Sequence, residues 1–109
     1  MTVFESVLLE EYQRPGRIIE RLQNEIVKLP VGYLRKKIIN GREYYYRQYR
    51  QGNKVVSEYI KKAEVDKVKK LIEIRKEDEQ GIKDMKKTRR QIERALGKEF
   101  LNELSKEIY

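Results

Sequence analysis

The sequence predicts an α+β protein with N-terminal helices, a three-stranded antiparallel sheet made of two hairpins, and a long C-terminal helix followed by a short final helix. Apolar residues recur at helical spacing before residue 30 and after residue 62. Between them, residues 33–60 form alternating runs of β-branched and aromatic residues, separated by glycine-containing turns. We expect a single domain over 1–109, with a helical segment at 1–30, the sheet at 33–60 and a long helical segment at 63–109.

The N-terminal segment is expected to form two helices. A Thr-x-x-Glu capping box beginning at Thr2 starts the first helix, and apolar residues follow at helical spacing. We expect Pro15, which is followed by glycine, to end that helix because proline lacks an amide donor and clashes with the preceding turn. A second helix is expected to run to about Lys28, before Pro30 and Gly32 turn the chain into the sheet.

The turns predict how the three strands pair. Asn-Gly at residues 40–41 is typical of a two-residue hairpin loop, and such a loop pairs Ile39 with Arg42 and Arg35 with Tyr46. The length of the second turn, within residues 51–53, is not decided by the sequence. A two-residue turn at either 51–52 or 52–53 gives the same assignment of side chains to faces. A three-residue turn would exchange the two faces of the third strand.

Side chains alternate along a strand, so this register places them on two faces. The apolar face collects Leu34, Ile38, Tyr45, Tyr49, Val56 and Ile60. The opposite face, called the basic face below, collects Tyr33, Arg35, Lys37, Arg42, Tyr44, Tyr46, Gln48, Arg50, Ser57 and Tyr59. The apolar face suits packing against a helix, whereas the basic face mixes the guanidinium, ammonium and phenol groups that bind nucleic acid.

The C-terminal segment is expected to form one long helix from about Glu64 to Leu96. Its apolar residues follow a heptad-like pattern that charged residues such as Arg75 interrupt. Gly81 lies near its middle, where we expect either a bend or a break. Gly97 is the expected C-cap, and apolar residues between Phe100 and Ile108 predict a short final helix.

The positive charge of the chain is concentrated on the predicted sheet. The formal net charge is +8, and residues 31–62 hold nine basic residues against two acidic ones. Such a surface attracts polyanions. Protection of edge strands against aggregation is the alternative explanation, although it does not require charge on the central strand.

Enzymatic activity is not expected. The sequence has no histidine and no cysteine, so the usual general base, the usual covalent nucleophile and the commonest metal ligands are missing. The sheet offers only Glu43 and Glu58 as acids, and Glu58 is expected to pair with Arg47 on the neighbouring strand. We therefore expect no catalytic residues, no metal site and no cofactor.

Nucleic-acid binding is the function that the residues favour, with DNA slightly ahead of structured RNA. The expected phosphate contacts are Arg35, Lys37, Arg42 and Arg50, with Lys61 and Lys62 at the junction between the third strand and the helix. Gln48 and the arginines are candidates for reading base edges. Tyr44, Tyr46 and Tyr59 either stack on unpaired bases or form a ladder that stabilises the sheet. On the long helix, Lys83, Lys87, Arg90 and Arg94 share one face, which is either an ordinary solvated surface, the favoured interpretation, or a second basic patch that contacts the backbone of the nucleic acid.

Residues 29–60 resemble an uncharacterised family of small bacterial and archaeal proteins. The shared pattern is present here as Leu29-Pro30-x-Gly32, Lys36-Lys37-Ile38, Gly41, Tyr44-Tyr45-Tyr46, Tyr49-Arg50, Gly52, Lys54-Val55, Ser57 and Tyr59-Ile60. That family implies no activity. More loosely, three strands followed by a helix resemble the AP2-like arm-binding domain of phage tyrosine recombinases, which implies a sheet placed in the DNA major groove but not recombination itself.

The alternative function is a protein-interaction module whose basic sheet binds an acidic protein surface. A small phage-type inhibitor of a nucleic-acid-handling complex, such as an anti-CRISPR protein, would combine the two functions. Formation of a homodimer through the long helix is a further alternative. No apolar run is long enough to span a membrane, so we expect a cytoplasmic protein whose partner is nucleic acid or a nucleoprotein complex and not a membrane.

Overall fold

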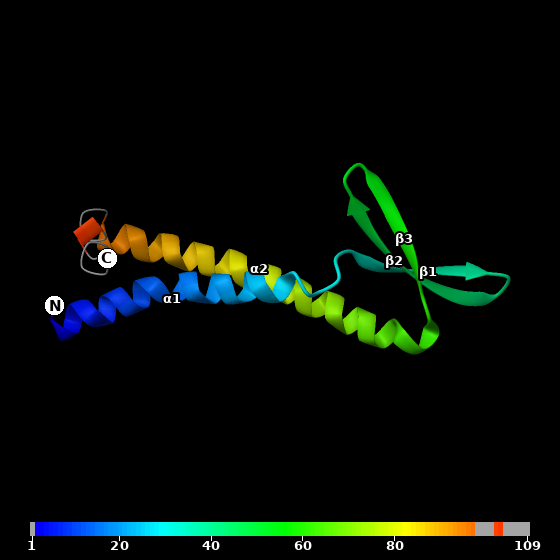
Figure 1. Cartoon of the computed structure of the whole chain (residues 1–109), viewed down its shortest axis with the longest axis horizontal. Coiled ribbons are helices and arrows are strands. Elements are labelled where there is room, and N and C mark those ends of the chain that lie inside the picture. Colours follow the sequence, from blue (N-terminus) through cyan, green and yellow to red (C-terminus); the bar gives the residue numbers. More distant parts are fainter. Residues whose placement is uncertain (1, 98–101, 104–109) are drawn as a thin grey trace. The chain divides into compact units, whose positions relative to one another are not determined.

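A computed structural model describes residues 2–97 and 102–103 and confirms an α+β fold (Figure 1). Helix α1 (Val3–Ile26) precedes strands β1 (Tyr33–Ile39), β2 (Arg42–Gln51) and β3 (Lys54–Ile60). A short 3-10 helix, η1 (Lys62–Glu64), then leads into helix α2 (Val65–Leu96). The contacts divide the chain into two compact units, which are described separately: a helical unit of residues up to Glu25 and from Asp78, and a sheet unit of Ile26–Glu77.

The helical unit pairs α1 with the C-terminal part of α2 in antiparallel directions (Figure 1). Near one end, the hydroxyl of Tyr12 donates a 3.5 Å hydrogen bond to the carboxylate of Glu93. The N-terminus of α1 and the C-terminus of α2 are both capped as the sequence predicts. The Thr2 hydroxyl accepts a hydrogen bond from the backbone N–H of residue 5, and Gly97, with φ of +82°, donates its N–H to the Glu93 carbonyl.

The predicted division of the N-terminal segment into two helices is wrong, because α1 continues through Pro15 and Gly16. Pro15 is buried and lines a hollow together with Met85 and Ile92 of α2. Proline removes one backbone hydrogen bond from a helix, but burial of its ring against a neighbouring helix offsets that loss. Packing within the helical unit therefore overrides the local signal for a break.

Helix α2 also continues through Gly81, so the expected break does not occur there. A Cβ atom at this position would lie 3.0 Å from Cδ1 of Leu22 on α1. The glycine thus allows close approach of the two helices. Most of the predicted final helix, between Phe100 and Ile108, lies outside the described residues.

The Tyr12–Glu93 contact predicts a loss of stability at alkaline pH. Burial, followed by the negative charge of Glu93, raises the pKa of Tyr12 above its ordinary value of 10.0. The folded state therefore favours the neutral phenol, and this stabilisation is fully present below pH 10 and is lost as pH rises through the folded-state pKa. We expect urea unfolding to show a larger stability loss above pH 10 in the wild type than in Tyr12→Phe. Equal losses of stability in the wild type and in Tyr12→Phe would contradict a raised pKa of Tyr12 in the folded state.

The sheet has strand order β1-β2-β3, and its register confirms the predicted pairing. Ile39 pairs with Arg42 across the first loop, where Asn40 and Gly41 have φ of +52° and +77°, as a type I′ turn requires. The second loop also has two residues, because Gln51 pairs with Lys54. The face assignment made from the sequence therefore holds for all three strands.

The apolar face packs against the first turns of α2 within the sheet unit. Ile60 on β3 and Ile72 on α2 are buried and form its core. A half-open groove of about 420 Å³ lies between β1, β2 and α2, with Leu34 and Tyr45 among its lining residues. Ile38 also belongs to the apolar face but is 67% exposed, so the packing does not extend to the end of the first hairpin.

Two guanidinium groups hold the connection between α1 and β1. Nη1 of Arg75 donates to the carbonyls of Ile26 at 2.6 Å and Leu29 at 2.7 Å, and Nη1 of Arg47 donates to the carbonyl of Val31 at 2.8 Å. Arg75 interrupts the apolar pattern of the helix and binds carbonyl groups at and just beyond the end of α1, of which that of Ile26 also accepts a 2.9 Å hydrogen bond from the Leu29 N–H. The course of the α1–β1 connection therefore depends on side chains that are distant in the sequence.

Candidate nucleic-acid interface

The basic face carries four positive charges and no negative charge on its strands. Its charged residues are Arg35, Lys37, Arg42 and Arg50, and all four are exposed. Arg42 and Arg50 lie near opposite ends of β2, so at about 3.4 Å per residue the charges extend over about 27 Å, which is long enough to follow several phosphates of one nucleic acid.

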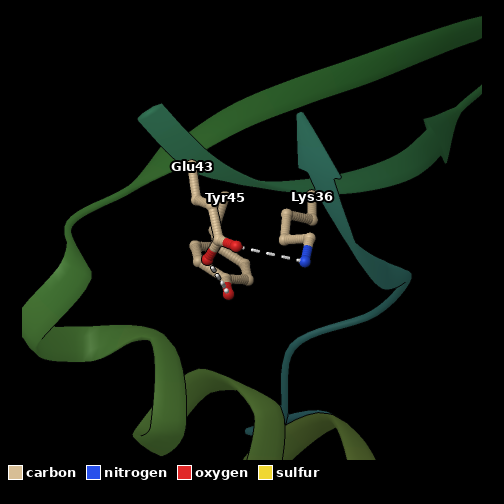
Figure 2. A network of polar contacts seen from close by, with 3 residues as sticks. All are labelled: Lys36, Glu43 and Tyr45. Carbon is tan, nitrogen blue, oxygen red and sulfur yellow. Dashed lines mark hydrogen bonds and ion pairs between the residues drawn. The ribbon is translucent and has the colours of Figure 1, made fainter. Parts of the chain in front are cut away.

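The two acidic residues of the strands lie on the opposite, apolar face, and each has a basic partner there. Lys36 Nζ lies 3.3 Å from Glu43, whose carboxylate also accepts a 3.3 Å hydrogen bond from the Tyr45 hydroxyl (Figure 2). Arg47 lies 2.9 Å from Glu58 and so confirms the expected ion pair. The positive charge on the apolar face is thus partly neutralised, whereas that on the basic face is not.

Three of the four tyrosines of the basic face form ring contacts with one another. The ring of Tyr59 lies 6.5 Å from that of Tyr44 and 5.8 Å from that of Tyr46, with tilted and edge-on geometries. Lys37 Nζ lies 4.9 Å from the centre of the Tyr46 ring. A ladder of this kind stabilises the sheet. Tyr59 is 55% exposed, so part of its surface is also accessible to a ligand.

Gln48 lies in the middle of the basic face but is only 8% exposed. Its Oε1 accepts hydrogen bonds from the Tyr33 hydroxyl at 2.9 Å and from Arg35 at 3.3 Å, and its Nε2 donates to the Ser57 hydroxyl at 2.9 Å. Contact between Gln48 and a base stays a prediction. For such a contact, the amide would have to give up or share the hydrogen bonds that it makes to Tyr33, Arg35 and Ser57.

Alternation along the strands also places Ile39 and Val55 on the basic face, in addition to the residues predicted from the sequence. They lie near the hairpin loops and are 47% and 62% exposed. The same period-two pattern that located the tyrosines would have found them. These two side chains add exposed apolar surface to the basic face at the ends next to the loops.

The remaining basic candidates are exposed. Lys61 follows β3 directly and Lys62 begins η1, both within the sheet unit. The four residues of the second basic patch, Lys83, Lys87, Arg90 and Arg94, lie on α2 in the helical unit. The two sets therefore belong to different units.

Within the part of the chain that the structure describes, no helix combines the length and apolar character needed to cross a membrane. The same residues contain no cluster of three or more acidic side chains arranged to hold a metal ion.

The model of one protein family matches residues 5–70, which is more than half of the chain. The chain therefore belongs to the DUF6788 family, which is described as a domain of unknown function. Searches of curated proteins and of solved structures found no match to this chain.

Proposed function

We propose that the protein binds nucleic acid through the basic face of its sheet, mainly by phosphate contacts and with DNA favoured over structured RNA. The observation that carries this proposal is the separation of charge between the two faces of the sheet. All charged side chains of the strands on the basic face are positive, and both acids lie on the apolar face. Release of counterions from phosphates then supplies affinity that does not depend on base sequence.

Two double variants with the same change in net charge test this proposal. Lys37→Ala/Arg50→Ala removes two charges from the basic face, whereas Lys36→Ala/Lys54→Ala removes two from the opposite face of the same sheet. If each basic-face residue neutralises one phosphate, the first variant should make the salt slope on duplex DNA shallower by about 1.8. The second variant should leave the slope close to the wild-type value.

The measurement is fluorescence anisotropy with labelled duplex DNA, single-stranded DNA and hairpin RNA at several salt concentrations. Circular dichroism establishes that both variants are folded. Equal effects of the two variants would mean that net charge, and not the basic face, determines binding. Failure of the wild type to bind any of the three probes at low salt would overturn the proposal.

A protein-interaction module is the second candidate, and exposed apolar residues on α1 favour it. Val3 is 83% exposed and Phe4 is 71% exposed, and both lie in the first turn of the helix. Apolar contact is less sensitive to salt than phosphate contact. Tight binding to one protein that persists at high salt, without binding to any nucleic-acid probe, would favour this candidate over the first.

A further inference from the structure

The amide of Gln48 has a fixed orientation because of its partners. An arginine side chain only donates hydrogen bonds, so the group that faces Arg35 must be the amide oxygen, Oε1. The Tyr33 hydroxyl, which lies 2.9 Å from the same oxygen, must then donate as well. On the other side Nε2 donates to Ser57, which leaves the Ser57 hydroxyl proton able to donate to another group.

Gln48 distinguishes Arg35 from the other arginines of the basic face. Arg42 and Arg50 are exposed, and within the described part of the chain their side chains make no hydrogen bond or ion pair. One N–H of Arg35, in contrast, is bound to a buried acceptor at the centre of the sheet, while the residue as a whole is exposed. Its remaining N–H groups can therefore be directed outward in a restricted geometry.

We propose that Gln48 is a positioning residue that fixes Arg35 to bind two adjacent acceptor atoms of a nucleic acid. This inference rests on the proposed function of the basic face. A planar guanidinium group binds paired acceptors through two parallel hydrogen bonds, and the acceptors are either two phosphate oxygens or O6 and N7 of guanine. Fixing the side chain beforehand lowers the entropy lost on binding. Arg42 and Arg50 act as mobile charges.

The test is a double-mutant cycle on binding to duplex DNA. Gln48→Met removes both hydrogen-bonding groups at similar volume, and we expect binding about three- to tenfold weaker, which corresponds to ordering one long side chain. The salt slope should not change because no charge is lost. In an Arg35→Ala background, Gln48→Met should cause no further weakening. Gln51→Met, on the same strand but the opposite face, is the matched control.

Three outcomes of this cycle decide between the two proposals. An equal loss in both backgrounds would mean that Gln48 supports the sheet as a whole, and it would overturn the positioning role. A Gln48→Met variant that binds like the wild type would also overturn it, while the proposed function stands. A wild-type protein that binds no nucleic acid would overturn the proposed function and this inference together.

Arg35→Lys identifies the acceptor pair, because lysine keeps the charge but loses the planar pair of donors. Equal weakening on dG·dC and dA·dT duplexes would assign the contact to phosphate oxygens. Weakening confined to the dG·dC duplex would assign it to the guanine edge. A variant that binds both duplexes as tightly as the wild type would overturn the paired contact.

Discussion

Gly32→Ala is expected to unfold the sheet unit. A Cβ atom at this position would lie 2.0 Å from the backbone carbonyl oxygen of Gln48 and 2.9 Å from Cβ of Tyr49. Gly32 also has φ of +100°, which side chains disfavour. Backbone atoms of the central strand cannot move aside without breaking its pairing. We expect a destabilisation of about 4 kcal/mol or more, since steric overlap and backbone strain act together.

Gly41→Ala is the matched control for this substitution. Gly41 also has positive φ, at +77°, but a Cβ atom there meets no other atom within 4 Å. Only the conformational strain of about 1 kcal/mol is then expected. Urea unfolding followed by circular dichroism, with hydrogen exchange of the sheet amides, compares the two variants. Equal stability of the two variants would show that glycine is needed at position 32 only because of the positive φ, and not because the chain approaches β2 closely.

Arg75→Met is expected to destabilise the sheet unit by about 2–4 kcal/mol. This substitution leaves the carbonyls of Ile26 and Leu29 without the donor that now binds them at 2.6 and 2.7 Å. Hydrogen bonds to charged groups contribute roughly 1.5–3 kcal/mol each. The Ile26 carbonyl keeps its hydrogen bond from the Leu29 N–H, so the loss is expected to come mainly from the two bonds to the guanidinium group. Because methionine keeps most of the side-chain volume, the loss of stability measures mainly the contribution of the guanidinium group.

Lys70→Met, which removes an exposed charge from the same helix, should change stability by less than about 0.5 kcal/mol. Arg75→Lys should give an intermediate value because an ammonium group can reach one carbonyl but cannot match the planar geometry of the guanidinium. Thermal unfolding monitored by circular dichroism measures all three variants. If Arg75→Met and Lys70→Met melt together, the two carbonyls do not depend on Arg75 for their hydrogen bonding.

The sheet register could be predicted from the sequence because its determinants are local. The Asn40-Gly41 turn sets the first pairing, and alternation then assigns each strand residue to a face. The predicted ion pair between Arg47 and Glu58 followed from the same register. The composition of the basic face could therefore be predicted from the sequence, including Ile39 and Val55, which follow from the same alternation.

The features that could not be predicted depend on contacts between distant parts of the chain. Pro15 remains inside a helix because its ring is buried against another helix, which no local pattern reveals. Arg75 is separated by 46 residues from the Leu29 carbonyl that it binds. The predicted register already places Tyr33 and Ser57 opposite Gln48, but it does not reveal that their hydroxyls and Arg35 bind the amide, which is only 8% exposed.

The anchoring of the α1–β1 connection also sets the limits of a transplantable fragment. A peptide cut to residues 33–60 would keep all of the basic face, yet it would lose Ile72, the buried partner of the apolar face, and Arg75. The compact unit Ile26–Glu77 contains both of these residues and the carbonyls that Arg75 binds. Grafting this surface onto another protein therefore requires residues 26–77, whose last seven residues, Arg75 among them, lie beyond residue 70, where the family match ends.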